Sequence, residues 1–241
     1  MEKDVLEAFG KLELERVPVA FRFSLDKPKG LQRLDEPLIA CGMVKKAREI
    51  GPFYSDHDGQ KCLAGRYVLG LGDVPEVFEN GAYGSALKYA KTPKAMQRIY
   101  RKLPKIEKGH VSYVSAAPLD KAEFEPDVVV VTCATTWKAF NLLRAYSYDS
   151  GKTWKGESTA ALGCAWMFSY PYITGEVNFV IPSGGMFHNH VIDRDEMIIA
   201  IPLEQLYGLV RNLKEMQMIM PAQAPGGDEW KRQLRKDLGI D

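Results

Sequence analysis

Four cysteines offer the most reactive chemistry in this sequence: Cys41, Cys62, Cys133 and Cys164. Each has a glycine or alanine within two residues, where the backbone can approach a ligand closely. Cys41 and Cys62 lie near the starts of predicted helices, where the dipole favours thiolate over thiol. Cys133 ends an apolar run and is expected to be a buried structural residue. For the other three, a redox or metal-binding site and simple packing fit equally well.

The spacing of the cysteines excludes the common local metal motifs. No two of them form a Cys-x-x-Cys pair, which zinc ribbons and ferredoxin-type clusters usually contain. Any shared site must therefore gather its ligands from separate elements of the fold.

Histidines provide a second set of candidate ligands. On extended backbone, the side chains of His188 and His190 would point to the same side and could bind one metal ion. Carboxylates at positions 193–196 lie close by in the sequence. Two histidines and a carboxylate suit non-haem iron or a similar ion. A solvated loop between two strands explains the same residues. His57, five residues before Cys62, is a further candidate for a metal site.

Aromatic and methionine side chains near Cys164 could form the wall of a tetrapyrrole pocket. Haem iron needs one or two axial ligands, and apolar burial supplies the remaining affinity. The residues expected in such a wall, and hence in cofactor binding together with the cysteines, are Phe168, Tyr172, Met186 and Phe187.

Composition narrows the class of protein. The 241 residues carry 32 basic and 31 acidic side chains, and a net charge of +1 gives no bias towards nucleic acid or membranes. No apolar run is long enough to cross a bilayer, and the charged N-terminus does not resemble a signal peptide. We therefore expect a cytoplasmic protein with reduced thiols.

Predicted strands and helices alternate along the second half of the chain, and these elements must position the candidate residues. Apolar β-branched runs at 111–116, 128–132, 177–181 and 197–201 predict strands, and the run at 128–132 suits a central strand. Helices are expected at 39–50, 63–69, 135–148, 160–170 and 203–216, and the helices over 75–103 are expected to be interrupted near Gly81 and Pro93. Loops are expected at 55–59 and 182–195. The fold class is a single α/β domain over 1–220, a mixed β-sheet flanked by helices with a helical N-terminal part.

The C-terminal residues 221–241 are predicted to be a linker followed by a short helix. Pro221–Gly227 has the composition of a linker, and Asp228 is placed to cap the helix. Trp230, Leu234 and Leu238 recur every four residues, so this helix has one apolar stripe. It could dock on its own domain, or on a second copy to make a homo-oligomer.

With these segments described, the chain resembles the domain-of-unknown-function 169 family of bacteria and archaea, many of them anaerobes. The resemblance covers nearly the whole chain. It rests on Pro18–Phe23, Cys41 with Lys46–Arg48, Lys61–Gly65 with Leu69–Leu71, Pro118–Leu119, Glu125–Val129, Gly163–Cys164, Tyr172–Gly175, Ile181–Gly185, Asp195–Met197 and Ile201–Pro202.

The resemblance implies a cysteine pattern at Cys41, Cys62 and Cys164 but no settled activity. Many members carry a further cysteine where this chain has Ser183, a departure that disfavours a four-thiolate cluster here and favours a mixed Cys/His site or an apolar pocket. Our leading hypothesis is a metallocofactor-binding protein, holding an iron-containing tetrapyrrole or an iron–sulfur cluster for storage, delivery or electron transfer. The alternatives are an enzyme with a cysteine nucleophile acting on a small anionic substrate, and a non-catalytic accessory subunit.

Overall fold

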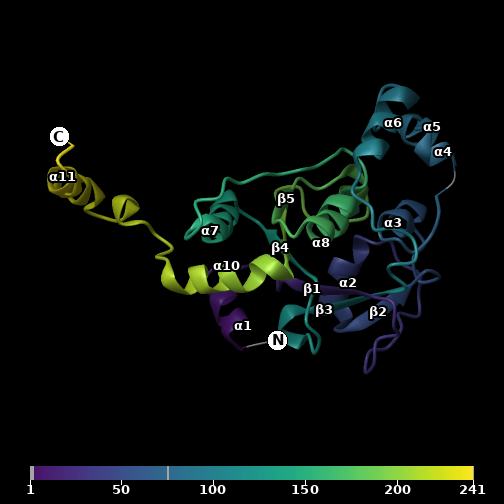
Figure 1. Cartoon of the computed structure of the whole chain (residues 1–241), viewed down its shortest axis with the longest axis horizontal. Helices are drawn as coiled ribbons and strands as arrows, with labels where there is room; N and C mark the ends of the chain where they lie inside the picture. The colour runs from purple at the N-terminus through teal and green to yellow at the C-terminus, as the bar shows by residue number, and fades with distance from the viewer. Residues whose placement is uncertain (1–2, 75, 241) are drawn as a thin grey trace.

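One six-stranded sheet organises the protein, and the computed structural model describes residues 3–74 and 76–240 of it (Figure 1). The strands lie in the order β2-β3-β1-β4-β6-β5, and every ladder between neighbours is antiparallel. Two isolated bridges, Arg33–Tyr54 and Leu38–Gln60, add parallel pairing. The strands are β1 (Val19–Ser24), β2 (Phe53–Asp56), β3 (Tyr113–Pro118), β4 (Val128–Cys133), β5 (Asn178–Val180) and β6 (Met197–Pro202).

Eleven α-helices are assigned within the described ranges, together with one π-helical and two 3-10 segments. The α-helices are α1 (Lys3–Gly10), α2 (Gly42–Ile50), α3 (Leu63–Val68), α4 (Glu76–Glu79), α5 (Ala82–Ala86), α6 (Pro93–Lys102), α7 (Thr136–Ser147), α8 (Tyr170–Thr174), α9 (Gly184–His188), α10 (Leu203–Glu215) and α11 (Gly227–Leu238). The other segments are η1 (Leu119–Lys121), the π-helical η2 (Ala165–Ser169) and η3 (Pro221–Gln223).

The sheet separates two hydrophobic cores, because alternate residues of a strand point to opposite faces. In β4, Val128 and Val130 belong to the core that contains α2, α3 and η2. Val129 and Val131 belong to the core that contains α1, α7 and α10. All six residues of β4 are buried, which confirms its predicted central position.

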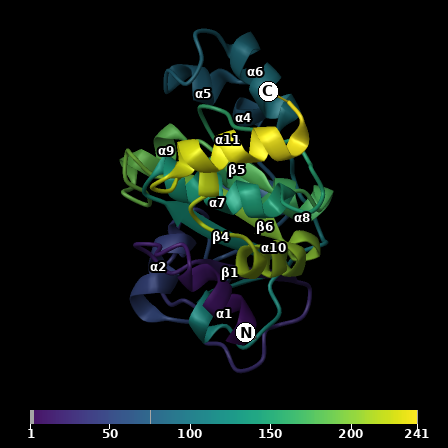
Figure 2. The same ribbon diagram turned by 90° about the vertical axis from the view of Figure 1, so that its left-hand side faces the viewer.

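Helices α4, α5 and α6 form one end of the molecule in both views (Figure 2). They pack on one another, and Met96 of α6 is fully buried among them. Gly84 allows this contact, because a Cβ there would lie 2.6 Å from Cγ of Met96. The sequence-based expectation of helices interrupted near Gly81 and Pro93 is confirmed, since Gly81 precedes α5 and Pro93 begins α6.

The fold class inferred from sequence, a single α/β domain with helices flanking one sheet, is confirmed. Two local predictions are wrong. The loop expected at 55–59 begins inside strand β2, whose backbone pairs with β3. The loop expected at 182–195 contains helix α9.

The C-terminal helix α11 stands away from the sheet and its covering helices (Figure 1). Gly226, rather than Asp228, is its N-cap, and Asp228 lies in the first turn. Trp230, Leu234 and Leu238 are all exposed, with α11 packing on the short turn η3. We expected two possible arrangements of this helix, and one of them was docking onto its own domain. The structure does not show that docking.

Candidate functional site

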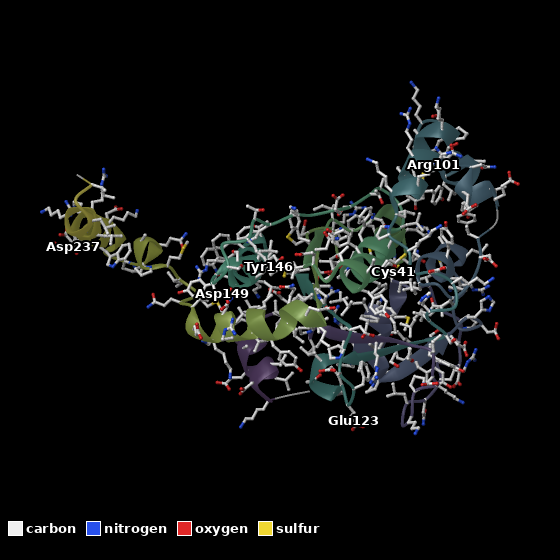
Figure 3. The ribbon with its side chains drawn as sticks, viewed as in Figure 1. Cys41, Arg101, Glu123, Tyr146, Asp149 and Asp237 are labelled. Carbon is white, nitrogen blue, oxygen red and sulfur yellow. The ribbon has the colours of Figure 1, made fainter. Side chains whose placement is uncertain are left out.

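A cavity of about 480 Å³ lies between the sheet-bearing body and the helices α4–α6. Its walls include Cys41, Cys62 and Cys164, which are separated by 20 to more than 100 residues in the chain but meet here. Figure 3 places Cys41 inside the molecule, below the helix that carries Arg101. The volume falls in the range of small-molecule and cofactor sites. The expectation that three of the four cysteines share one hollow therefore agrees with the structure.

Each of the three cysteines immediately precedes a helical segment. Cys41 is the N-cap of α2, and Cys62 is the N-cap of α3, where its Sγ accepts the N–H of Gly65 at 3.3 Å. Cys164 precedes the π-helical segment η2. π-Helical turns occur frequently at functional sites, where they change which side chains face the ligand.

Close backbone packing holds these helices together. Gly65 of α3 lies so near the segment before α2 that a Cβ at this position would be 2.8 Å from Cβ of Ala40. The Ser169 hydroxyl of η2 donates to the Val68 carbonyl of α3 at 2.7 Å, and this bond is buried. Cys41, Cys62 and Cys164 are thus positioned by one packed unit rather than by flexible loops.

Ser183 lines the same cavity as the three thiols and is the N-cap of α9. Gly163, which precedes Cys164, faces it closely: a Cβ there would lie 3.0 Å from Oγ of Ser183 and 2.8 Å from Sδ of Met186. The position at which we expected a departure from a four-cysteine pattern is therefore part of the cavity. We call Cys41, Cys62, Cys164, Ser183 and Met186 the thiol wall.

Burial keeps the thiols of Cys41 and Cys164 protonated at neutral pH. Desolvation, with a smaller effect from Cys62, raises the pKa of Cys41 to about 12. Desolvation also raises the pKa of Cys164 well above its ordinary value, and charges at Cys41 and Cys62 add to the effect. Each of these thiols therefore lies within electrostatic reach of its neighbours. All four cysteines of the chain are free.

Cys133 belongs to a different part of the protein. It ends β4, is fully buried, and packs in the core on the opposite face of the sheet from the cavity. Burial raises its pKa to about 12. The structural role predicted for Cys133 agrees with this placement.

The opposite side of the cavity is aromatic. Phe78 of α4 stacks on Tyr83 of α5 with ring centroids 4.5 Å apart, and its centroid lies 6.4 Å from that of Tyr100. Tyr89, in the connection before α6, reaches α9, since a Cβ at Gly184 would be 2.9 Å from its ring. We call this surface the aromatic wall; its residues are Phe78, Tyr83, Leu87, Tyr89 and Tyr100.

Sequence reasoning missed the aromatic wall. Its residues lie on α4, α5 and α6 and on the connection between α5 and α6, where aromatic side chains at these intervals are indistinguishable from ordinary core positions. The sequence did contain one signal for this wall, the helix interruptions at Gly81 and Pro93. They separate α4, α5 and α6 and so allow these helices to pack on one another.

Of the aromatic and methionine residues predicted for a cofactor pocket, Met186 lines the cavity. Phe168 is buried in the core, 4.6 Å from Phe21 between ring centroids, and Tyr172 packs on Phe23 at 4.9 Å. Phe187 is half-buried against the same core. The π-helical segment changes the directions in which the side chains after Cys164 point. A prediction based on a regular α-helix with 3.6 residues per turn does not include this change.

The three predicted histidine ligands lie outside the cavity lining. His188 ends α9, and His190 follows with a positive φ of 50°, so the extended backbone assumed for this pair is wrong. Both are exposed. His57 is also exposed, and its Nδ1 lies 2.8 Å from a carboxylate oxygen of Asp58.

Within residues 3–74 and 76–240, no three His, Cys, Asp or Glu side chains are grouped to hold one metal ion. The mixed Cys/His site suggested by the sequence is therefore not assembled in this structure. On the thiol wall the donors are instead three thiols, the thioether of Met186 and the hydroxyl of Ser183, and none of the described residues that line the cavity is a carboxylate.

The helices can also be judged against the length and hydrophobicity that a membrane-spanning segment requires. In the part of the chain that the structure describes, no helix has both the length and the apolar character needed to cross a bilayer.

One comparison with known proteins gives a family. The model of the DUF169 family, described as uncharacterised ArCR, matches residues 10–212, which include both walls of the cavity. No curated protein and no solved structure matches the chain.

Proposed function

The chain belongs to the DUF169 family, and we propose that it binds an iron–sulfur cluster in its cavity for electron transfer, or for storage and delivery of the cluster. The proposal rests on one observation: Cys41, Cys62 and Cys164 converge on a single apolar hollow from three separate helical segments. Thiolates are the ligands that hold such clusters.

A multi-iron cluster asks less of the thiol positions than a single ion does. The described residues hold no group tight enough for one metal, whereas in a multi-iron cluster each cysteine binds a different iron. Three thiols would hold three irons, and Ser183 lines the same cavity. When bound, the cluster would supply one-electron chemistry; the chain supplies the ligands, an apolar enclosure, and aromatic side chains that limit water.

Cluster binding must displace the thiol protons that burial retains. Because the pKa values of Cys41 and Cys164 are raised, metal loading competes with protons at neutral pH. Loading should therefore become more favourable as the pH increases from 7 to 9.

A tetrapyrrole is less well supported as the occupant. The wall expected for it places Phe168 and Tyr172 in the core, and the histidines that could serve as axial ligands lie outside the lining. A cysteine nucleophile with a histidine base is likewise less well supported, because no histidine is among the described residues that line the cavity.

Anaerobic purification with reconstitution tests the proposal. We expect broad visible absorbance with matching iron and acid-labile sulfide in the wild-type protein. Cys41→Ser, Cys62→Ser and Cys164→Ser should each lose most of the iron. Cys133→Ser is the matched control, since it removes a buried thiol on the opposite face of the sheet, and it should retain the iron.

A gain-of-function variant makes the same test sharper. Ser183→Cys would add a thiol to the cavity wall and should slow the loss of visible absorbance in air, because four thiolates complete the ligand set of a cubane cluster. A wild-type protein that takes up no iron and sulfide, or a Cys133→Ser variant that loses them equally, would refute the proposal.

A further inference from the structure

The aromatic wall has binding chemistry that the proposed cluster does not use. Three tyrosine side chains face the cavity, and within the described chain Tyr83, Tyr89 and Tyr100 make no hydroxyl hydrogen bond. Two tyrosines outside this wall do donate to carboxylates: the Tyr67 hydroxyl donates to Glu79, and the Tyr146 hydroxyl donates to Glu176. The hydroxyls of the aromatic wall therefore remain available to a ligand.

Tyr100 is the best placed of the three. It is half-buried, and it lines both the cavity and a neighbouring polar depression. Burial raises its pKa to about 12, with additional effects from Tyr83, Tyr89 and Cys62. The Tyr100 hydroxyl therefore stays a protonated hydrogen-bond donor at neutral pH.

The charges around the cavity favour an anion. Lys61 is the one charged residue in the described lining, and no carboxylate lines the cavity. The remaining surface of the aromatic wall is apolar, with Phe78 stacked on Tyr83 and Leu87 beside them. A ligand that matches this surface has one negatively charged oxygen acceptor and a planar apolar body.

We propose that the cavity binds a small aromatic monocarboxylic acid, with the carboxylate accepting from Tyr100 near Lys61 and the ring lying against Phe78. In this arrangement the ring contacts the stacked pair Phe78 and Tyr83 of α4 and α5. This inference goes beyond cluster binding and depends on a different set of residues.

Isothermal titration of the full-length protein with benzoate, phenylacetate and cinnamate tests the inference, with benzamide as the uncharged analogue of benzoate. We expect saturable binding of at least one acid and weaker binding of benzamide. Tyr100→Phe should weaken the acid about tenfold or more, because a hydrogen bond to a charged acceptor is lost. Lys61→Met should weaken it up to about fivefold, as for an exposed ion pair.

Tyr148→Phe is the matched control, because Tyr148 is exposed at the end of α7, away from the cavity lining. It should bind like the wild type. No saturable binding of the three acids, equal binding of benzamide and benzoate, or equal losses in Tyr100→Phe and Tyr148→Phe would overturn the inference.

Iron content measured on the same samples separates the two proposals. Acid binding that depends on Tyr100 in iron-free protein supports this inference even if the cluster proposal fails. An iron-loaded protein whose acid affinity is unchanged by Tyr100→Phe overturns this inference and leaves the cluster proposal intact.

Discussion

At the scale of single residues, the cavity brings together thiols that differ in their surroundings. Cys164 is almost fully buried, whereas Cys41 and Cys62 are half-buried at the N-termini of α2 and α3. Cys62 also accepts a backbone N–H from Gly65. These environments decide which thiol can react with small molecules when no metal is bound.

The raised pKa values predict slow alkylation of the metal-free protein. At neutral pH the thiolate fraction of Cys41 should be about a thousandfold below that of an ordinary thiol, since its pKa rises from 9.0 to about 12. Its rate with iodoacetamide should keep increasing through pH 9, where an unperturbed thiol begins to level off. Mass-spectrometric mapping between pH 7 and 10 measures this.

The internal reference for that measurement is the same chain in denaturant. There Cys41, Cys133 and Cys164 should react alike, because unfolding removes the desolvation that raises each pKa. Equal rates for Cys41 in the folded and denatured protein would show that burial does not control its reactivity.

Part of the site was predictable from residue types, and part was not. Cys41 and Cys62 were correctly placed at helix starts, and Cys133 was correctly separated from them, because flanking glycines and apolar runs are local signals. That Cys164 joins the first two depends on long-range packing between Ser169 and Val68, which no local pattern encodes.

At the scale of elements, close helix contacts set the geometry of the thiol wall. Helix α3 approaches the residue before Cys41 at a glycine, Gly65, where a side chain would meet Ala40. The contact therefore determines how far Cys62 lies from Cys41.

Gly65→Ala tests this contact. Overpacking typically costs about 1–3 kcal/mol, so the substitution should lower the free energy of unfolding and reduce iron uptake. Gly208→Ala in α10 is the matched control, because it has open space around the added methyl, and it should be neutral or stabilising by up to about 1 kcal/mol. Chemical denaturation and iron analysis measure both effects. Gly65→Ala behaving like Gly208→Ala would contradict the tight contact.

The elements themselves were predicted unevenly. Strand β4 and helix α7 were found because a fully apolar run followed by Thr135, a side-chain N-cap, is a strong local signal. Strand β2 was missed because Phe53–Asp56 is short and becomes a strand through pairing with β3. Helix α9 was missed because its two glycines indicate a loop, and its packing against Tyr89 and Gly163 is tertiary.

At the scale of the whole molecule, the C-terminal helix is the element least accounted for by the rest of the fold. Isolated helices of about 12 residues are marginal in water, and α11 has 12 residues with its apolar stripe exposed. The family match ends at residue 212, before this helix. Self-association through α11, or docking on another protein as an accessory subunit, would cover the stripe.

Deletion of residues 221–241 separates these roles. We expect the free energy of unfolding of the remaining chain to change by less than about 0.5 kcal/mol, because residues 228–240 are exposed. We also expect the full chain to sediment as an oligomer and the truncated chain as a monomer. Trp230→Ser with Leu234→Ser serves as the control that keeps the length of the chain. A monomeric full-length protein would contradict self-association.

The two-sided sheet has a practical consequence for anyone who wants to build a biosensor from this protein. A fluorophore or fused reporter attached on the side of α7 and α10 would be shielded from the cavity by the whole thickness of the sheet. It could signal occupancy only through changes transmitted across the strands. A dye placed on α6, which contributes Tyr100 to the cavity lining, would instead sit close to the cavity and respond directly, so the choice of attachment site decides what such an instrument reads.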